Sequence, residues 1–416
     1  MNFIFISPHF PTNYWHFCDH LARHGVNVLG IGDSPYDQLH QGLKDSLTEY
    51  YRVGSMENYD EMYKAVAYFA FKYGPIDWLE SNNEYWMERD AELRTAFHIT
   101  TGFCNDVRLA RSEAHPEGHP HILEVTKKSE MKRFYEKAGV PSCRFILSTE
   151  GLEAMRDFAV EVGYPLIVRP NVGEAAFSIE KIDDDEALAA FHTDHGAERE
   201  CVVEPYVTGD IWAYDAIIDA EGNPIFESNS VWPPSMAAIV VKRLDCTYYA
   251  TSTIDPALRD VGRRTIKAYG VKSRFVHCEF FRLAFDHPSL GRKGDFVGLS
   301  VNMRPGGGFT PDVINYAHDT DVYGIWADMV CGAKADPESD AKADGPTVYV
   351  AFAGLRDGVE YEHSHDEIIR RYSRNICMNG RVPDVLANAL GNRAYIARFA
   401  TAEEKDEFFA YATSRR

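Results

Sequence analysis

The sequence predicts an α/β protein in which a parallel-sheet domain is followed by α+β segments. Strand and helix patterns alternate through the first hundred residues, whereas later strand patterns follow one another and can pair as antiparallel hairpins. The length of 416 residues corresponds to a few domains at about 100–200 residues each. Each of these domains is large enough to bury its own core.

The first domain is predicted from three strand patterns separated by helix patterns. The strands are NFIFIS, NVLGIG and PIDWLES, and the helices lie near residues 14–24 and 59–73. Such alternation is typical of a parallel sheet with helices on its faces, and ligands bind beyond the carboxyl ends of its strands. We therefore expect the loops at residues 7–11, 33–36 and 80–84 to face a cleft.

Composition and charge argue against several classes of partner. With 63 acidic and 43 basic residues the net charge is -20, which repels phosphate backbones, so no nucleic-acid partner is expected. The apolar runs are too short for a membrane span, and the first ten residues do not resemble a signal peptide. The eight cysteines form no CxxC motif, which favours reduced thiols in the cytoplasm. The NAD fingerprint is incomplete and no Walker motif occurs.

Two polar segments separate the predicted units. The first, residues 112–121, contains His115, His119 and His121, which could ligate a metal ion. Their irregular spacing and the nearby prolines favour a solvated hinge instead. The second, residues 334–345, is the clearest linker, and a small α+β tail follows it.

A predicted hairpin brings polar side chains together in the later half of the chain. Its strands are RFVHCEFFRL and DFVGLSVNMR, and in the first of them His277, Glu279 and Phe281 share one face. If Leu283 pairs with Phe296, Glu279 lies opposite Ser300, with Asn302 one step along the same face and Arg304 beyond it. Such hard oxygen ligands, together with substrate phosphates, suit magnesium. The alternative for Glu279 is a half-exposed strand residue paired with a lysine.

A glycine-rich loop follows the hairpin directly. Gly306, Gly307 and Gly308 leave backbone amides free to approach a ligand, and their place after Arg304 favours an anion or carboxylate. The alternative is a plain flexible loop.

Further cations and a strand end lie upstream. Lys128 opens a helix, although a solvated helix face would equally explain Lys128, Lys127 and Lys132. Arg169 ends the apolar strand PLIV, and a charged residue at the end of a buried strand indicates a cleft. The segment VVEPYVTGD, residues 202–210, could hold a planar base at its turn or be an ordinary strand end.

These motifs, taken in order, resemble the ATP-grasp superfamily. KSEMKRFYEKAGVP is similar to the first ATP-lysine helix of that family, GYPLIVRP to its second cationic strand, and EPYVTGD to its adenine hinge. CEFF followed by VNMRPGG resembles its metal strands and substrate loop, and is the most specific part. The resemblance covers roughly residues 1–330 and is nearest to the branch of carbamoyl phosphate synthase, biotin carboxylase and the carboxylate–amine ligases.

The resemblance implies a role for each motif residue. Lys128 and Arg169 would contact phosphates, and Arg304 would stabilise the transferred phosphoryl group or the acyl phosphate. The adenine would lie against the backbone of Glu204, Pro205, Tyr206 and Val207, with Asp210 near the ribose. The metal, Mg²⁺ or Mn²⁺, would be bound by Glu279, Asn302 and Ser300. The substrate acid would lie at Arg304, Gly306, Gly307 and Gly308.

The resemblance also implies an organisation and an activity. The expected parts are an amino-terminal parallel α/β domain (1–111), a linker (112–125), a small ATP-grasp subdomain with its lid (126–205), a large subdomain with the metal and substrate site (206–333), a second linker (334–345) and a carboxyl-terminal α+β segment (346–416). The activity would be an ATP-dependent ligation of a small-molecule carboxylate to an amine through an acyl phosphate. Carboxyphosphate or carbamate chemistry, a weakly catalytic ATP-binding regulator, and a homodimer remain open.

Two positions depart from the pattern of the family. Ser300 stands where a second metal-binding glutamate is usual, so Mg²⁺ should bind more weakly unless Glu227, Asp215 or Asp312 substitutes for it. The loop at residues 171–178 has one glycine where relatives often have several, which leaves the phosphate lid fewer ways to wrap a ligand.

Overall fold

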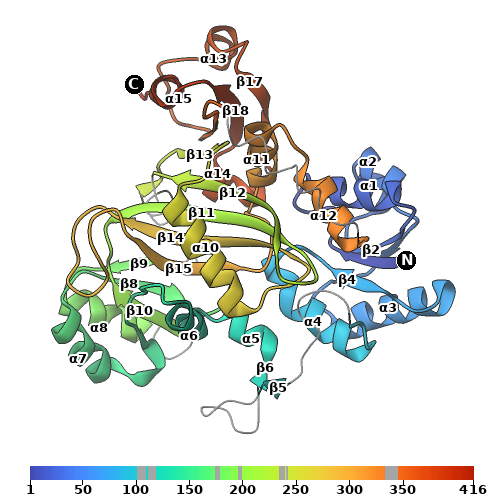
Figure 1. The fold of residues 1–416 in the computed structure, drawn as a ribbon, viewed down its shortest axis with the longest axis horizontal. Helices are drawn as coiled ribbons and strands as arrows, with labels where there is room; N and C mark the ends of the chain where they lie inside the picture. The colour runs from blue at the N-terminus through green and yellow to red at the C-terminus, as the bar shows by residue number, and fades with distance from the viewer. Residues whose placement is uncertain are drawn as a thin grey trace.

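The computed structural model describes most of the chain and contains three main sheets. The described residues are 1–100, 109–110, 119–173, 179–194, 199–233, 239, 242–332 and 345–416. Figure 1 shows the amino-terminal domain on the right, a small sheet at the lower left, and a large sheet between them. His115, the side chains of His119 and His121, and nearly all of the linker at residues 334–345 lie outside the described part.

The predicted parallel sheet of the amino-terminal domain is confirmed. Its order is β3-β2-β1-β4, and every neighbouring pair is parallel. The strands are β1 (Asn2–Ile6), β2 (Asn27–Gly32), β3 (Glu49–Arg52) and β4 (Trp78–Glu80), and the helices are α1 (Trp15–Arg23), α2 (Gln41–Ser46), α3 (Tyr59–Tyr73) and α4 (Met87–Ala96). Their apolar side chains fill the cores on both faces of this sheet.

A small antiparallel sheet follows, with the order β7-β10-β8-β9. Its strands are β7 (Ile146–Leu147), β8 (Leu166–Pro170), β9 (Glu180–Ile182) and β10 (Cys201–Pro205). The helices of this region are α5 (His121–Thr126), α6 (Lys128–Ala138), α7 (Leu152–Val162) and α8 (Asp185–Asp194), and a short ribbon, β5 (Leu109–Ala110) with β6 (His119–Pro120), precedes them. Residues of α7, α8 and three of these strands share one core.

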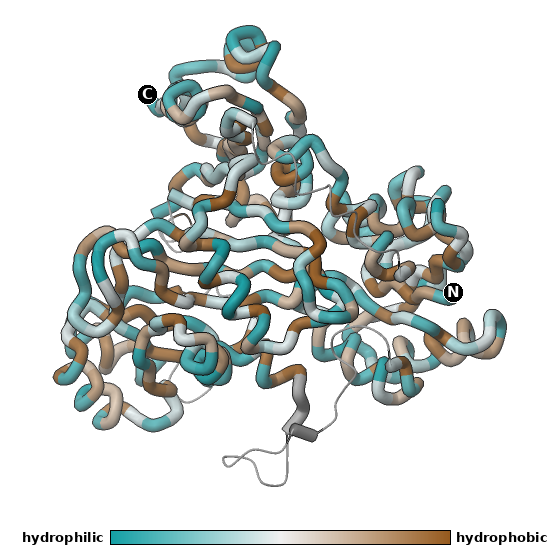
Figure 2. The backbone as a smooth tube through the Cα atoms, in the orientation of Figure 1, coloured by the Kyte–Doolittle hydropathy of each residue, from teal (hydrophilic) through white to brown (hydrophobic). Residues whose placement is uncertain are grey.

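The large sheet has the order β15-β14-β11-β12-β13-β16-β18-β17. Its strands are β11 (Gly209–Ile218), β12 (Pro224–Trp232), β13 (Cys246–Thr251), β14 (Arg274–Leu283), β15 (Phe296–Asn302), β16 (Tyr349–Leu355), β17 (Ile376–Arg381) and β18 (Arg393–Phe399). The strands after residue 345 therefore extend the same sheet, because β16 pairs with β13. Figure 2 shows apolar segments running along these central strands.

Helices cover the two faces of the large sheet. The helix α10 (Pro256–Tyr269) packs on the face that carries Tyr214, and α11 (Thr310–His318) packs on the face that carries Trp232. The remaining helices are α12 (Val322–Val330), α13 (His365–Arg371), α14 (Asp384–Leu390) and α15 (Ala402–Ala412). The helix α12 shares a core with α1, which joins the large sheet to the amino-terminal domain. Among the described helices, none has both the length and the apolarity to cross a membrane.

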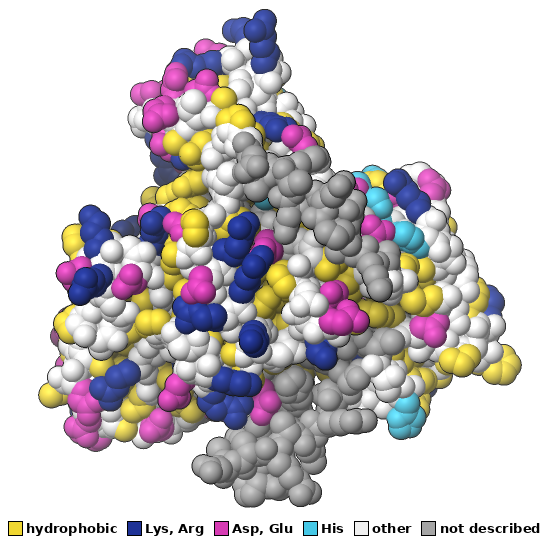
Figure 3. Space-filling model, viewed as in Figure 1, with side chains coloured by type: hydrophobic (Ala, Val, Ile, Leu, Met, Phe, Trp, Pro, Cys, Tyr) yellow, Lys and Arg dark blue, Asp and Glu magenta, His cyan; other side chains and the backbone are white. Residues whose placement is uncertain are grey.

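Basic side chains gather over α10 on the face shown in Figure 3. Acidic residues balance them: Arg263 is paired with Glu227, and Arg264 Nε lies 2.9 Å from Asp260 Oδ2. Two arginines of this basic surface are thus paired with carboxylates.

The hairpin of β14 and β15 forms as expected, but its predicted register is wrong at one end. Phe296 pairs with Arg282 rather than with Leu283, while Glu279 still lies opposite Ser300. Between the pairs Glu279–Ser300 and Phe280–Gly298, β15 contains one extra residue, a β-bulge. This bulge shifts the pairing of the two strands by one position. Periodicity alone did not reveal this bulge.

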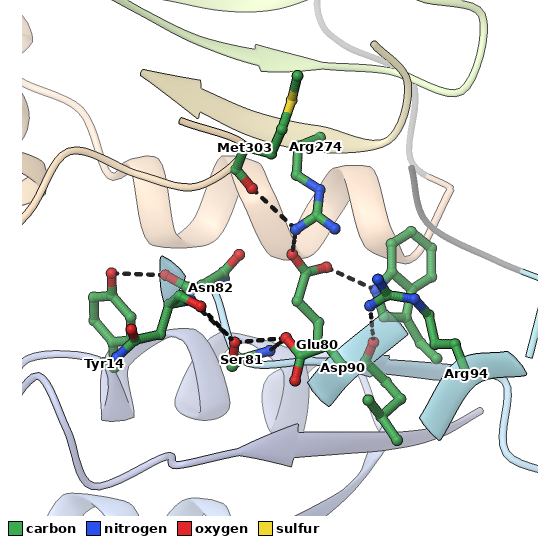
Figure 4. A network of polar contacts seen from close by, with 11 residues as sticks. Tyr14, Glu80, Ser81, Asn82, Asp90, Arg94, Arg274 and Met303 are labelled. Atoms are coloured by element: carbon green, nitrogen blue, oxygen red, sulfur yellow. Dashed lines mark hydrogen bonds and ion pairs between the residues drawn. The ribbon is translucent and has the colours of Figure 1, made fainter. Parts of the chain in front are cut away.

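A buried ion pair clamps the amino-terminal domain to this hairpin, as Figure 4 shows. Arg274, at the start of β14, pairs with Glu80 at the end of β4, and its Nη1 also donates to the carbonyl oxygen of Met303 at 3.1 Å. Trp78 Nε1 donates to the other oxygen of Glu80 at 3.0 Å. The carboxyl end of β4 is thereby fixed beside the residues that follow β15.

The contact between α10 and β11 leaves no room for a side chain at Gly262. A methyl group there would lie 2.4 Å from the ring of Tyr214, which is fully buried. Overpacking of this kind costs about 1–3 kcal/mol, so we expect Gly262→Ala to lower the free energy of unfolding by that amount in denaturant titrations. Gly380→Ala serves as the control, because within the described part of the chain no atom outside its own and the adjacent residues lies within 4 Å of the added methyl. Equal stability of the two variants would contradict this packing argument.

Candidate functional site

Four polar residues from β14 and β15 share one face of the hairpin. His277 pairs with Asn302 and Glu279 pairs with Ser300 across the two strands. Ser300 Oγ donates a hydrogen bond to Glu279 Oε2, and His277 Nε2 lies 3.5 Å from Glu279 Oε1. On the neighbouring strand β11, Asp215 Oδ1 lies 2.7 Å from His277 Nδ1. The expected convergence of Glu279, Ser300 and Asn302 on one face is thus present, and among the described residues no lysine forms an ion pair with Glu279.

Charge determines the protonation states of this cluster. Burial acts to raise the pKa of Glu279, but the hydrogen bond and charge of His277, with Ser300 and Arg304, lower that pKa to about 2. Burial acts to lower the pKa of His277, but Asp215 and then Glu279 raise it to about 10. Near neutral pH the carboxylate of Glu279 is therefore ionised and the imidazole of His277 is protonated.

The three neighbouring lysines, which the sequence could not distinguish, have different partners in the structure. Lys127 Nζ lies 3.3 Å from Glu200 Oε1, and Lys132 Nζ lies 2.5 Å from Glu204 Oε1. Lys128 is 5% exposed, and its Nζ donates to the carbonyl oxygen of Gly173 at 2.9 Å. Burial and then the charge of Arg169 lower the pKa of Lys128 to about 8. Its position and its pKa distinguish Lys128 as the buried lysine of the site.

Arg169 and Glu204 form a buried ion pair between β8 and β10. Arg169 Nε donates to Glu204 Oε2 at 3.1 Å, and the two residues lie on adjacent strands of the small sheet. Burial acts to raise the pKa of Glu204, but Arg169 and Lys132 lower it to about 2. The guanidinium of Arg169 is therefore held in place by an ionised carboxylate.

Residues 206–208 connect β10 to β11, and their side chains differ in exposure. Tyr206 is 45% exposed, and its amide donates to the carbonyl oxygen of Pro165 at 3.0 Å. Val207 is buried in a small core with Leu283 and Val297. Asp210 is exposed near the start of β11.

Arg304 and the glycine loop lie against the amino-terminal domain. Arg304 Nη2 lies 2.7 Å from Glu84 Oε2, and Arg304 Nη1 donates to the carbonyl oxygen of Pro305 at 2.8 Å. Asn13 Nδ2 donates to the carbonyl oxygen of Gly308 at 3.1 Å. The loop at residues 80–84, which follows β4, thus contacts the predicted substrate arginine.

The glycine loop is packed rather than free. A methyl group at Gly306 would lie 2.7 Å from Thr310 Cγ2 and 3.1 Å from His277 Nδ1. Gly308 has a φ of +63°, and a methyl group there would lie 2.5 Å from Leu390 Cδ1. Glycine is required at both positions, which argues against the alternative of a plain flexible loop.

Asn82 is an unusual residue of the same loop. It is 1% exposed, has a φ of +53°, and accepts a hydrogen bond from the Tyr14 hydroxyl through its backbone oxygen at 3.0 Å (Figure 4). Among the described residues, neither atom of its side-chain amide has a hydrogen-bond partner. Buried amides normally find partners, so this side chain has one donor and one acceptor group available for a ligand.

Two of the three acidic residues that could have replaced the missing glutamate are placed elsewhere. Glu227 lies on the opposite face of the large sheet, where it binds Tyr214 and Arg263. Asp312 accepts a hydrogen bond from Asn13 Nδ2 at 2.8 Å. Only Asp215 lies in the cluster, and it reaches Glu279 through His277 rather than directly. Sequence spacing had placed His277 on the correct face but gave it no role.

The residues of this face fit one divalent ion. They offer a carboxylate, a carboxamide and a hydroxyl, which suits an ion that completes its coordination with substrate phosphates. Within the described part of the chain, no group of three or more His, Cys, Asp and Glu side chains could hold a metal by itself. An ion at this face would therefore complete its coordination with oxygen atoms of water or of a bound molecule.

Comparison with known proteins gives structural matches over nearly the whole chain. No protein-family model matches the sequence. An L-amino acid ligase from Bacillus licheniformis matches with a TM-score of 0.66 and 13% identity, covering 98% of this chain and 95% of the other. An N5-carboxyaminoimidazole ribonucleotide synthetase in complex with ADP matches with a TM-score of 0.67 and 11% identity, covering 98% and 94%.

A third match is the biotin carboxylase domain of a 2-oxoglutarate carboxylase from Hydrogenobacter thermophilus, in complex with magnesium ADP, ADP and bicarbonate. Its TM-score is 0.67 at 13% identity, covering 100% of this chain and 90% of the other. At these identities the comparisons establish the fold of the chain.

Proposed function

We propose that this chain, which has the ATP-grasp fold, is an ATP-dependent ligase that joins a carboxylic acid to an amine through an acyl phosphate. One observation carries the proposal: charged groups of the two sheets lie close enough to shift one another's pKa values. These groups are Lys128 and Arg169 beside the small sheet, and Glu279 and Arg304 beside the large sheet. The charges of Arg169, Glu204 and Glu279 shift the pKa of Lys128. The charge of Arg304 lowers the pKa of Glu279. Phosphoryl transfer depends mainly on such positioning and charge neutralisation.

In the proposed nucleotide site, Lys128 and Arg169 bind the phosphates. The backbone of Glu204, Pro205, Tyr206 and Val207 holds the adenine, and Asp210 contacts the ribose. The ion pair of Arg169 with Glu204 supports this role because it fixes the direction of the guanidinium before the nucleotide arrives. Mg²⁺ or Mn²⁺ bound to Glu279, Asn302 and Ser300 would neutralise charge on the phosphates.

In the proposed acid site, Arg304 and the amides of Gly306, Gly307 and Gly308 bind the substrate carboxylate. A carboxylate oxygen attacks the γ-phosphorus, ADP leaves, and an acyl phosphate forms. The amine nitrogen then attacks the acyl carbon, phosphate leaves with the former carboxylate oxygen, and the nitrogen loses a proton to solvent. Arg304 stabilises the charge on the transferred phosphoryl group, and the free amide of Asn82 orients one of the two substrates.

The second candidate is carboxyphosphate chemistry, in which bicarbonate takes the place of the organic acid. Two observations favour it: the second cation is an arginine, Arg169, and the likeness extends to a biotin carboxylase domain with bound bicarbonate. A nucleotide-binding regulator is the third candidate, which the serine at position 300 favours.

Release of ADP separates the three candidates. We would measure it with Mg²⁺ or Mn²⁺ against a panel of organic acids, amino acids and bicarbonate, each with and without hydroxylamine. Acid-dependent ADP release with formation of a hydroxamate supports the ligase. Turnover with bicarbonate alone would favour the second candidate, and tight ATP binding without turnover under all conditions would favour the third.

The lowered pKa of Lys128 predicts a pH dependence of ATP binding. Only the protonated amine neutralises phosphate, and its pKa of about 8 means that it loses its proton as the pH rises through that value. The affinity for ATP should therefore be roughly tenfold lower at about pH 9 than at about pH 7, as measured by calorimetry. Lys128→Arg should remove this dependence because arginine remains charged, whereas Lys127→Arg should keep it. A dependence that persists in Lys128→Arg would rule out this assignment.

A further inference from the structure

The imidazole of His277 lies between two carboxylates that come from different strands. Its Nδ1 is 2.7 Å from Asp215 Oδ1, and its Nε2 is 3.5 Å from Glu279 Oε1. Asp215 is fully buried, whereas the side chain of Glu279 is 24% exposed, so the open side of this row is the side of Glu279. The nucleotide proposed above would approach from that side.

This arrangement matches the surroundings of metal-binding histidines in proteins. Such histidines usually donate the ring N–H that does not bind the metal to a carboxylate, as Nδ1 of His277 does to Asp215. Two ligand atoms that each lie about 2.1 Å from one ion are roughly 3.0–3.4 Å apart at octahedral or tetrahedral angles. The separation of 3.5 Å between His277 Nε2 and Glu279 Oε1 is close to this range.

The cross-strand neighbours complete the donor set. Asn302 lies directly opposite His277, and Ser300 lies directly opposite Glu279. Side chains at such positions have Cβ atoms about 4.5–5.5 Å apart, near enough to share one ion. Asn302 can thus provide an amide oxygen beside the imidazole nitrogen and the carboxylate.

We propose that His277 Nε2 ligates the divalent ion together with Glu279 and Asn302, and that this nitrogen makes the site prefer Mn²⁺ to Mg²⁺. The inference rests on the proposed function, since the remaining ligands are the phosphates of ATP. The ring nitrogen releases its proton to solvent when the ion binds, and Asp215 continues to hold the other ring nitrogen. His277 takes the place of the carboxylate that Ser300 cannot supply, and imidazole nitrogen suits transition metals better than it suits Mg²⁺.

The alternative is that His277 only neutralises its two carboxylates and never contacts the ion. Electron spin echo envelope modulation of bound Mn²⁺ distinguishes the two, because it detects nitrogen nuclei that coordinate the metal. The probes are Mn²⁺ alone and Mn²⁺ with the β,γ-imido analogue of ATP, on the full chain. We expect imidazole nitrogen modulations that shift when the protein is labelled with ¹⁵N-histidine. Bound Mn²⁺ without any histidine signal would overturn the proposal, and this measurement needs no variant.

Variants then test the selectivity. In His277→Ala the ratio of Mn²⁺ to Mg²⁺ affinity should fall roughly tenfold, and in His277→Ala with Ser300→Glu the restored carboxylate should strengthen Mg²⁺ binding. His318→Asn is the matched control, because His318 is hydrogen-bonded to Ser228 and, among the described residues, forms no ion pair with Asp215 or Glu279. An unchanged ratio in His277→Ala would refute the role of the imidazole.

The same measurements separate this inference from the function on which it rests. A histidine signal from Mn²⁺ alone, without any binding of the nucleotide analogue, would support the metal ligand and contradict the ATP-dependent function. Nucleotide-dependent Mn²⁺ binding without a histidine signal would support the function and contradict the metal ligand.

Discussion

Replacing Arg274 with methionine is expected to lower the free energy of unfolding by about 3–5 kcal/mol, because it leaves a buried carboxylate without its cation. Glu80 and Arg274 have side chains that are 1% and 3% exposed, so water cannot replace the lost partner. The pair also joins the amino-terminal domain to β14, and its loss weakens that junction. Denaturant titrations of the full chain measure the effect.

A double variant provides the control for this prediction. Adding Glu80→Gln to Arg274→Met removes the unpaired charge and should restore part of the stability, since a neutral amide costs less to bury. If the double variant were less stable than Arg274→Met alone, the loss would come from packing and not from charge.

Replacing Arg304 with alanine is expected to reduce the rate of ADP formation by about 10²–10³-fold while ATP binding stays unchanged. The reason is that Arg304 is proposed to stabilise charge that develops only during phosphoryl transfer. It pairs with Glu84 and its charge lowers the pKa of Glu279, so it lies near both parts of the proposed site. The rate is measured with the acid and amine that the substrate panel identifies.

The matched control is Arg282→Ala. Arg282 lies toward the other end of β14, where its guanidinium lies 4.8 Å from the centre of the Trp212 ring and 3.4 Å from Asp255 Oδ2. This variant should retain full turnover. Loss of ATP binding in Arg304→Ala, or equal losses of turnover in both variants, would contradict the assigned role.

Much of the fold could be predicted because apolar runs mark the strands that lie inside sheets. The runs of β1, β2 and β4 were visible in the sequence, but β3 was not, since Glu49–Arg52 is a half-exposed edge strand with charged ends. The pairing of Leu283 with Phe296 was wrong because a bulge has no signature in the alternation of residues. Gly298, beside that bulge, is required by the ring of Tyr135, which a methyl group would approach to 2.5 Å.

The candidate site could be predicted only where its residues are neighbours in the sequence. Glu279, Ser300 and Asn302 belong to one hairpin, so strand periodicity was enough to bring them together. Glu84 and Arg304 lie 220 residues apart in the chain, and no local pattern links them. The role of Asp215 depends on the pairing of β11 with β14, which local alternation could not specify.

The order of strands in the large sheet has a consequence for synthesis of the protein. The strand β13 pairs with β16, and β16 pairs with β18, so the sheet is incomplete until the last of these emerges from the ribosome. A nascent chain that ends before residue 349 would expose the backbone of β13 as an open edge, which invites aggregation. The parallel sheet does not depend on strands that are synthesised late, because β1 to β4 lie within the first 80 residues. Premature termination near the 3′ end of the message should therefore yield insoluble protein even though every residue of the proposed nucleotide site has been translated.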